Sequence, residues 1–478
     1  MRDLVLIIFV ISLLPVVIFR PYIGLLLWAW IGYMNPHRLT WSFAYNFRFN
    51  LLIAIATIIG ILYTMRFNFR IPWKTPIFLI ILFVLWTTIT AMEAFRPVAA
   101  LVALDKFSKV QIMIIATLIL VKNRRQIIVL VAVIALSIGF FGLKGGIFTL
   151  TSGGNYRVMG PAQSFFEDNN ALALALIMVS PLLYFLQFQL KYRILRLGMI
   201  FITLFSIISI LGSYSRGGFV GLSVLLIAFW LKTRRKILVT VAMLVIGPGL
   251  YTFMPEKWHE RMNLVIESAF EAVDTFDEVE KEVKPVLRNL PRRTPVEHTF
   301  FLSFLNQDTE LLQDKSVSGR LDAWRLALLI VDDRPLLGGG FGAFEQQTFD
   351  RYTPGVYRHS AHSIYFEVLG EQGYPGFLLW VTLHLSALLM GYRINRRTRH
   401  IPELLWLRDL TGMLQVSLIG YYSAGTFLGM AYFDLPYHLI SILVILFAYT
   451  ENHLYQRQPL PTTIHSRWPH HNRRMKTP

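Results

Sequence analysis

Residues 358–376, which read RHSAHSIYFEVLGEQGYPG, mark the point where a long polar segment ends and a long apolar segment begins. The polar segment before this stretch covers residues 255–361, and apolar runs of about membrane-spanning length recur on both sides of it. His362 stands at the junction. This organisation is typical of a helical membrane protein with one large loop outside the bilayer.

Composition supports the same fold class. The 478 residues are 54% hydrophobic and 16% charged, which is more apolar than a soluble domain requires. The mean hydropathy is +0.50. The net charge of +17 does not indicate nucleic-acid binding, because the basic residues cluster in short loops between apolar runs. The absence of cysteine excludes disulfides and thiolate chemistry. We therefore predict an all-α polytopic membrane protein.

The apolar runs predict the membrane spans. They fall at 4–19, 21–34, 50–65, 75–93, 99–121, 126–143, 169–190, 195–212, 217–231, 237–254, 362–391, 409–431 and 437–451. Two short helices over residues 1–34 would place the N-terminus outside. We prefer a single crossing kinked at Pro21, because each short helix is marginal for a core about 30 Å thick. This count gives about twelve transmembrane helices and an N-terminus inside.

The loops alternate in charge, and this alternation predicts the topology. By the positive-inside rule, the basic loops and the tail are cytoplasmic. They are 66–74, 122–125, 191–196, 232–236, 393–399 and 452–478. The remaining loops, 35–49, 94–98, 144–168, 213–216, 255–361 and 432–436, are then outside.

The chain divides into four parts on this basis. Residues 1–254 are N-terminal transmembrane helices, 255–361 an external helical cap, 362–451 C-terminal transmembrane helices, and 452–478 a basic cytoplasmic tail. Within the cap we predict one helix over Glu267 to Lys284, ended by prolines, and a second near 319–332. A glycine-rich turn follows at 337–344.

Arg216 lies in the sequence SYSRGG, at the predicted external start of the helix over 217–231. A helix N-terminus attracts anions, and an arginine fork can bind two phosphate oxygens at once. Gly217 and Gly218 would let a ligand approach the backbone closely. A snorkelling interfacial arginine would explain the same residue, although positive charge is disfavoured on the outer face.

Further external cations are candidates for anion binding. Arg320 lies in the cap, where a salt bridge with Asp322 or Asp332 is the simpler explanation. Lys144 and Arg157 lie in the predicted loop 144–168. They could add positive charge to an anion site, although an ordinary structural role explains these two residues better still.

His362 begins the long helix from outside, where a neutral imidazole can accept a proton. His359 competes for this role, and an interfacial contact is the simpler explanation of either histidine. Glu167 and Asp168 are a weak signal for a metal, and helix capping by Asp168 or Asn169 explains them better. No metal or cofactor site is predicted. The glycines at 338–342 lack the strand that a nucleotide loop needs.

These motifs resemble a known family. His362-Ser363, nine residues, then Gly373 and Gly376 are similar to the histidine signature of bacterial O-antigen ligases. SRGG at 215–218 resembles the arginine motif before their periplasmic loop, and the region after Arg320 resembles the loop arginine region. The resemblance covers about residues 155–385. Phe377-Leu378 replaces the usual small residues after the last glycine. The N-terminal third, with RPYIGLLLWAWIGYMNPHRLTW, looks like putative O-glycosylation ligases of exosortase systems.

The resemblance implies a GT-C-like glycosyltransferase of the O-antigen ligase/polymerase superfamily in the bacterial inner membrane, with its active site facing the periplasm. It would transfer a glycan from undecaprenyl pyrophosphate to lipid A–core with inversion and without a metal, in lipopolysaccharide biosynthesis. His362, Arg216 and Arg320 would be catalytic. Arg157, Lys144, Ser215, Gly217 and Ser363 would bind substrate.

Alternative functions remain open at the level of sequence. An O-antigen polymerase or a protein O-oligosaccharyltransferase of the same superfamily would differ only in its acceptor. A transporter is the alternative of another class, because Asp105, Lys106, Lys109, Glu367 and Glu371 fall within apolar runs.

Overall fold

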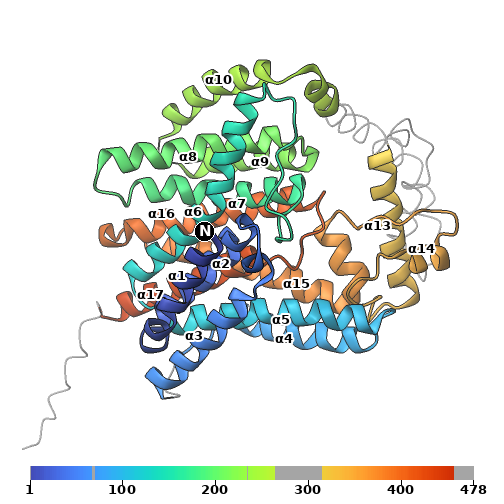
Figure 1. The fold of residues 1–478 in the computed structure, drawn as a ribbon, viewed down its shortest axis with the longest axis horizontal. Coiled ribbons are helices and arrows are strands. Elements are labelled where there is room, and N and C mark those ends of the chain that lie inside the picture. Colours follow the sequence, from blue (N-terminus) through green and yellow to red (C-terminus); the bar gives the residue numbers. More distant parts are fainter. Residues whose placement is uncertain (1, 67–69, 234, 264–314, 457–478) are drawn as a thin grey trace, which may run out of the picture.

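A computed structural model describes residues 2–66, 70–233, 235–263 and 315–456 of the chain. In this part of the chain the elements are helices, with no strand (Figure 1). Their bounds are α1 Arg2–Phe19, α2 Pro21–Met34, η1 Pro36–Leu39, η2 Phe43–Asn46, α3 Phe49–Met65, α4 Thr75–Met92, α5 Pro97–Leu120, α6 Arg124–Thr151, α7 Asn169–Gln187, α8 Arg193–Gly212, α9 Arg216–Lys232, α10 Lys236–Phe253, α13 Lys315–Asp333, α14 Gln346–Tyr352, α15 Ile364–Arg397, η4 Pro402–Leu404, α16 Leu405–Gly425 and α17 Asp434–Gln456.

The helices follow the predicted apolar runs closely, and the chain is a polytopic helical membrane protein. Seven of the described helices are long and apolar enough to cross a membrane, or eight if the bent pair Val239–Phe253 and Glu256–Asn263 is one span. Helix starts have local causes: proline occupies the first turn of α4 and α5, and Asn123 and Gln126 form a capping box at α6.

The interpretation of residues 1–34 as one kinked crossing needs correction. The rings of Phe9 and Trp30 lie 5.8 Å apart, so α1 and α2 fold back on each other as a hairpin. The backbone turns at Arg20, which has φ −135° and ψ 74°, and Pro21 begins the next helix. A Cβ at Gly24 would lie 2.5 Å from a methyl group of Val17, so the bare glycine allows this close packing. Both ends of the hairpin therefore lie on the same side of its turn, and Asp3 accepts from the amides of Ser42 and Ala44 in the loop 35–49, both at 3.2 Å. The predicted inside N-terminus and the count of twelve depended on a single crossing here and are not supported, and the number of crossings stays a prediction.

The basic loops gather at one end of the bundle. Lys74 and Arg397 both pair with Glu451, at 2.5 and 3.6 Å. The Arg124 guanidinium lies 5.0 Å above the ring of Trp406. These contacts join four of the segments around the predicted cytoplasmic loops, as the charge pattern predicts.

The described part of the polar segment lies at the opposite end, where α13 and α14 run across the ends of α4, α5 and α15 (Figure 1). The second predicted cap helix is confirmed as α13. The predicted helix over Glu267 to Lys284 lies outside the described residues, as does the basic tail. The external loop predicted at 144–168 begins later than expected, because α6 continues to Thr151.

A glycine turn ties the polar segment to α15. The amides of Gly339 and Gly340 donate to the carbonyls of Gly370 and Glu371, both at 2.8 Å. In return, the amide of Tyr374 donates to the carbonyl of Pro335 at 2.9 Å. These bonds require a break in α15, which occurs at Gly373 with φ 66° and ψ −175°. A side chain there would collide with the Leu336 carbonyl oxygen.

Gly373→Ala is therefore expected to destabilise the protein. Its positive φ and its contact with the Leu336 carbonyl each penalise a Cβ, and strain of this kind costs about 1–3 kcal/mol. Thermal unfolding of the purified protein in detergent measures the effect. Gly32→Ala in α2 is the matched control, because no described atom lies within 4 Å of its added Cβ. Equal unfolding midpoints for the two variants would refute the role of Gly373.

Candidate active site

His362 lies in the connection between α14 and α15 with a left-handed backbone, φ 44°. Histidine adopts this conformation rarely, so the surrounding contacts must hold it. Trp324 on α13 supplies two of them. Its indole Nε1 donates to the Ala361 carbonyl at 2.9 Å, and its ring stacks on Phe366 with centroids 4.8 Å apart. The imidazole Nε2 of His362 lies 3.2 Å from the Ser360 hydroxyl.

Arg320 comes from the first half of α13, and the structure brings it near His362. The preceding residue, Gly319, packs directly on the ring of His359, where a Cβ would lie 2.7 Å from the imidazole. The helix can approach the 359–362 connection because position 319 has no side chain. Arg320 is consequently close enough to act electrostatically on the His362 imidazole.

Burial lowers the pKa of His362, and the charge of Arg320 lowers it further. Asp168 acts in the opposite direction, and His359 adds a smaller lowering effect. The imidazole is therefore neutral at pH 7 and able to accept a proton, as a general base must be.

Asp168 has a clear structural role as the N-cap of α7. Its carboxylate accepts from the amides of Asn170 and Ala171 at 2.8 and 3.0 Å, which confirms the predicted cap. The neighbouring Glu167 accepts from the amide of Gln163 at 2.9 Å. Among the described residues, no group of three or more His, Cys, Asp or Glu side chains could hold a metal ion.

Arg216 is the first residue of α9, and its side chain is buried, with 9% exposed. Ser215 caps the helix, because its hydroxyl accepts from the amide of Gly218 at 2.9 Å. Arg216 lines a cleft of about 350 Å³. The other lining residues are Asn155, Arg157, Tyr214, Lys257, Glu260 and Arg261. Four cations and one carboxylate face this cleft, so it suits an anion carrying more than one charge.

The short helix after α10, Glu256–Asn263, closes the cleft on one side. The indole of Trp258 donates to the Leu211 carbonyl at 3.0 Å, and Nε of Arg261 donates to the Tyr214 carbonyl at 2.9 Å. Tyr214 itself donates to the Gly154 carbonyl at 2.6 Å. Lys257 and Arg261 were not among the residues predicted from sequence. The available signal was a basic pair four residues apart on a predicted external face, where positive charge is disfavoured.

The cleft and the His362 region share the N-terminus of α7 as a neighbour. On the cleft side, the Asn169 side chain donates to the Ser213 carbonyl at 2.7 Å. On the other side, Asp168 acts on the pKa of His362. The connection after α16 also touches both regions, because a Cβ at Gly217 would meet Phe427 at 3.0 Å and one at Gly429 would meet the His362 amide at 3.5 Å.

Three residues predicted to bind substrate, Lys144, Gly217 and Ser363, do not show a clear binding role in their surroundings. Lys144 lies within α6 rather than in a loop; its side chain is exposed and does not line the cleft. Phe427 fills the space beside Gly217, so packing of α9 against the end of α16 accounts for this glycine without ligand approach. Ser363 is 1% exposed, and its hydroxyl has no hydrogen-bond partner among the described residues. Roles in substrate binding for these three residues stay predictions.

Residues 201–381 match the family described as O-antigen ligase. This stretch is an O-antigen ligase family domain. It contains Arg216, Arg320 and His362, and it extends from α8 to the middle of α15. The domain indicates a glycosyltransferase-type activity of the ligase/polymerase superfamily. Residues 1–191 match a family of unknown function. Among curated proteins, none matches the chain significantly.

The pKa of His362 is expected to respond to its two charged neighbours in opposite directions. Arg320→Gln should raise this pKa, because it removes a cation, and Asp168→Asn should lower it while keeping a capping oxygen. Diethyl pyrocarbonate modifies only the neutral imidazole, so its reaction with His362 against pH, followed by mass spectrometry, reports the pKa. Arg358→Gln is the control, since Arg358 pairs with Glu345 at 2.8 Å. Shifts of the same sign in both test variants would contradict the assignment.

Proposed function

We propose that this chain is an O-antigen ligase that transfers a glycan from undecaprenyl pyrophosphate to lipid A–core on the periplasmic face of the inner membrane. One observation carries the proposal. A cleft with four cations at a helix N-terminus lies at the same end of the bundle as a histidine kept neutral by burial and by Arg320. A diphosphate leaving group needs cations that stabilise its negative charge, and a hydroxyl acceptor needs a neutral histidine that takes its proton.

In the proposed reaction, the imidazole of His362 takes the proton of the acceptor hydroxyl. The acceptor oxygen forms a bond to the anomeric carbon as the bond from that carbon to the pyrophosphate oxygen breaks. The electron pair leaves with undecaprenyl pyrophosphate, and attack from the opposite face inverts the anomeric centre. Arg216, Arg157, Lys257 and Arg261 stabilise the negative charge that grows on the leaving group. Arg320 completes the positive field while keeping His362 neutral.

The path of the lipid tail follows from the position of the cleft. Tyr214 lies in the connection between α8 and α9, Arg216 begins α9, and Lys257 lies in the short helix that follows α10. The side chains of α10 are largely exposed, among them Leu244 at 70% and Val245 at 68%. We infer that the polyprenyl chain lies along the apolar faces of α9 and α10, with its pyrophosphate in the cleft above them.

The transporter alternative receives little support from the charged residues on which it depends. Asp105 and Lys109 pair with each other one turn apart on α5. Glu367 accepts from the amide of Ala431 at 2.9 Å, and Glu371 accepts from the amide of Gly342 at 2.8 Å. These contacts hold loops in place around α15. The polymerase and the protein O-oligosaccharyltransferase differ from the ligase in the acceptor, which a transfer assay distinguishes.

His362→Ala is expected to reduce transfer by about 10²–10⁴-fold, the usual contribution of a general base. The assay combines the protein in lipid, a polyprenyl-pyrophosphate-linked glycan and lipid A–core, and a gel shift detects the product. His400→Ala is the matched control, because it removes an exposed imidazole at the opposite, basic end of the bundle and should retain most of the activity. Full transfer by His362→Ala would remove this residue from the mechanism. Elongation of the lipid-linked glycan in place of transfer would identify a polymerase.

Arg216→Lys is expected to lower transfer by about 10–100-fold, because lysine keeps the charge and loses the two-pronged hydrogen bonding. Arg351→Lys on α14 is a control at the same end of the molecule, with an exposed side chain. Wild-type rates for Arg216→Lys would contradict the pyrophosphate assignment. The same assay with EDTA tests the predicted metal independence; a loss of transfer that Mg²⁺ restores would direct attention to Glu167 and Asp168.

A further inference from the structure

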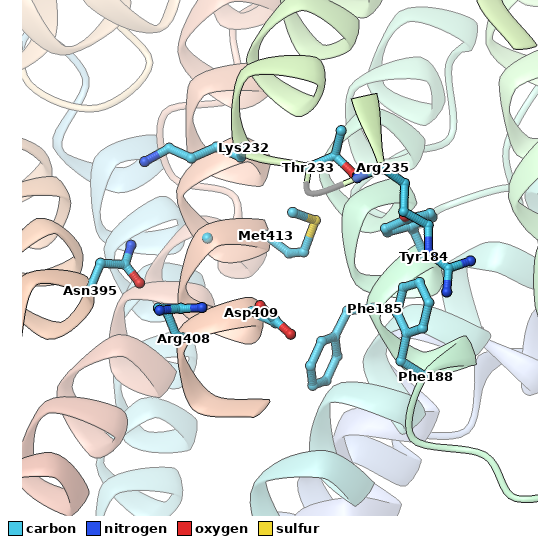
Figure 2. A pocket seen from close by; sticks show the side chains of 11 residues that line it. Tyr184, Phe185, Phe188, Lys232, Thr233, Arg235, Asn395, Arg408, Asp409 and Met413 are labelled. Atoms are coloured by element: carbon cyan, nitrogen blue, oxygen red, sulfur yellow. The ribbon is translucent and has the colours of Figure 1, made fainter. Parts of the chain in front are cut away.

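A second cavity lies at the opposite, basic end of the bundle and has no role in the proposed reaction. Its volume is about 430 Å³, and it opens between the C-terminal end of α7, the α9–α10 connection and the start of α16 (Figure 2). The residues that line it are Tyr184, Phe185, Phe188, Lys232, Thr233, Arg235, Asn395, Arg408, Asp409, Gly412 and Met413.

Three cations and one carboxylate face this cavity, so its net charge is positive. Neighbouring groups hold each cation in position. Nζ of Lys232 donates to the Gln415 side chain at 3.3 Å, and Nη1 of Arg408 donates to the Arg399 carbonyl at 3.0 Å. The Arg235 guanidinium lies 5.4 Å from the ring centroid of Phe188. Each side chain still has further N–H groups for a ligand, since lysine has three donors and arginine five.

The other part of the lining is apolar and continues onto exposed apolar surface. Tyr184, Phe185 and Phe188 form one side of the cavity, and the Met413 thioether lies between them and Lys232 (Figure 2). Phe188 is 45% exposed. On the adjoining helices, Leu231 and Ile237 are 60% and 83% exposed. A ligand with a charged head and apolar tails can therefore place its head in the cavity and its tails along α9 and α10.

A buried oxygen atom in the same cavity indicates that the ligand also has a hydrogen-bond donor. Asn395 Oδ1 is buried and has no hydrogen-bond donor among the described residues, although its amide nitrogen donates to Gln415 at 3.1 Å. A buried acceptor without a donor is unfavourable unless a ligand or water supplies one. The hydroxyl groups of a glycerol headgroup are suitable donors to this oxygen and to the carboxylate of Asp409.

We infer that this cavity binds the headgroup of an anionic glycerophospholipid, with the phosphate between Lys232, Arg235 and Arg408. Basic pockets between helices on the cytoplasmic side of membrane proteins bind such headgroups. The net positive charge favours an anionic lipid over a zwitterionic one. The inference is independent of the glycan-transfer proposal and depends on the charge pattern that places this end in the cytoplasmic leaflet.

The test is native mass spectrometry of the delipidated full chain in detergent, titrated with phosphatidylglycerol and, separately, with phosphatidylethanolamine. Wild-type protein is expected to bind phosphatidylglycerol more tightly. Arg235→Gln should weaken this binding about tenfold, the effect of losing a charged hydrogen bond. Arg393→Gln is the matched control, because it removes one positive charge from the same end of the molecule outside the cavity. Thermal unfolding without lipid shows whether Arg235→Gln is folded. If Arg235→Gln is not folded, Lys232→Gln takes its place in the titration.

The outcomes separate the sources of binding. Weaker phosphatidylglycerol binding in Arg235→Gln, with wild-type binding in Arg393→Gln, supports the site. Equal losses in the two variants would show attraction to general surface charge and overturn it. Equal affinity for phosphatidylethanolamine would overturn the preference for an anionic lipid. Inorganic phosphate is the last probe: if it raises the unfolding temperature as much as phosphatidylglycerol does, the ligand is a free anion and the lipid assignment is wrong.

Discussion

The backbone hydrogen bonds between the glycine turn and the break in α15 are the constraint on which the candidate site depends. A continuous helix has no free carbonyls in its middle, so a loop can pair with α15 only where the helix is interrupted. Gly373 supplies the interruption, and the turn containing Gly339 and Gly340 occupies it. This junction joins the C-terminal end of α13 to α15. Trp324, in the middle of α13, makes a second connection to the start of α15 through the Ala361 carbonyl and Phe366. Next to the Trp324 attachment, His362 and Arg320 are held on facing elements.

This arrangement gives a physical reason for the glycines of the histidine signature. Gly373 is needed for its positive φ and for close approach of the Leu336 carbonyl, and Gly376 packs against Trp86. Neither glycine needs to touch a ligand to matter for activity, because both set the position of the α15 N-terminus. The same logic applies to Gly319 and Gly217, where a missing side chain allows two elements to meet. The spacing of the motif therefore reflects helix docking as much as chemistry.

Much of the fold follows from the sequence because the membrane restricts the solutions. Hydropathy predicted nearly every described helix within a few residues, and loop charge predicted which loops share an end, as the contacts of Glu451 illustrate. The N-terminal hairpin was beyond this reasoning. Hydropathy reports that residues 1–34 are apolar, whereas packing of Phe9 on Trp30 and of Gly24 on α3 decides whether they cross once or fold back.

Residue chemistry identified His362, Arg216, Arg157 and Arg320 as candidates, because charged and titratable groups at an external membrane face require an explanation. Their grouping could not be predicted in the same way. Lys257 and Arg261 join the cleft through hydrogen bonds of Trp258 and Arg261 to backbone carbonyls of the α8–α9 connection, and Lys144 is left outside because α6 is longer than its apolar run. Composition and periodicity indicate the secondary structure that each segment forms and the side of it that is apolar. Only long-range packing decides which segments meet, because a contact between distant helices depends on the shapes of both surfaces.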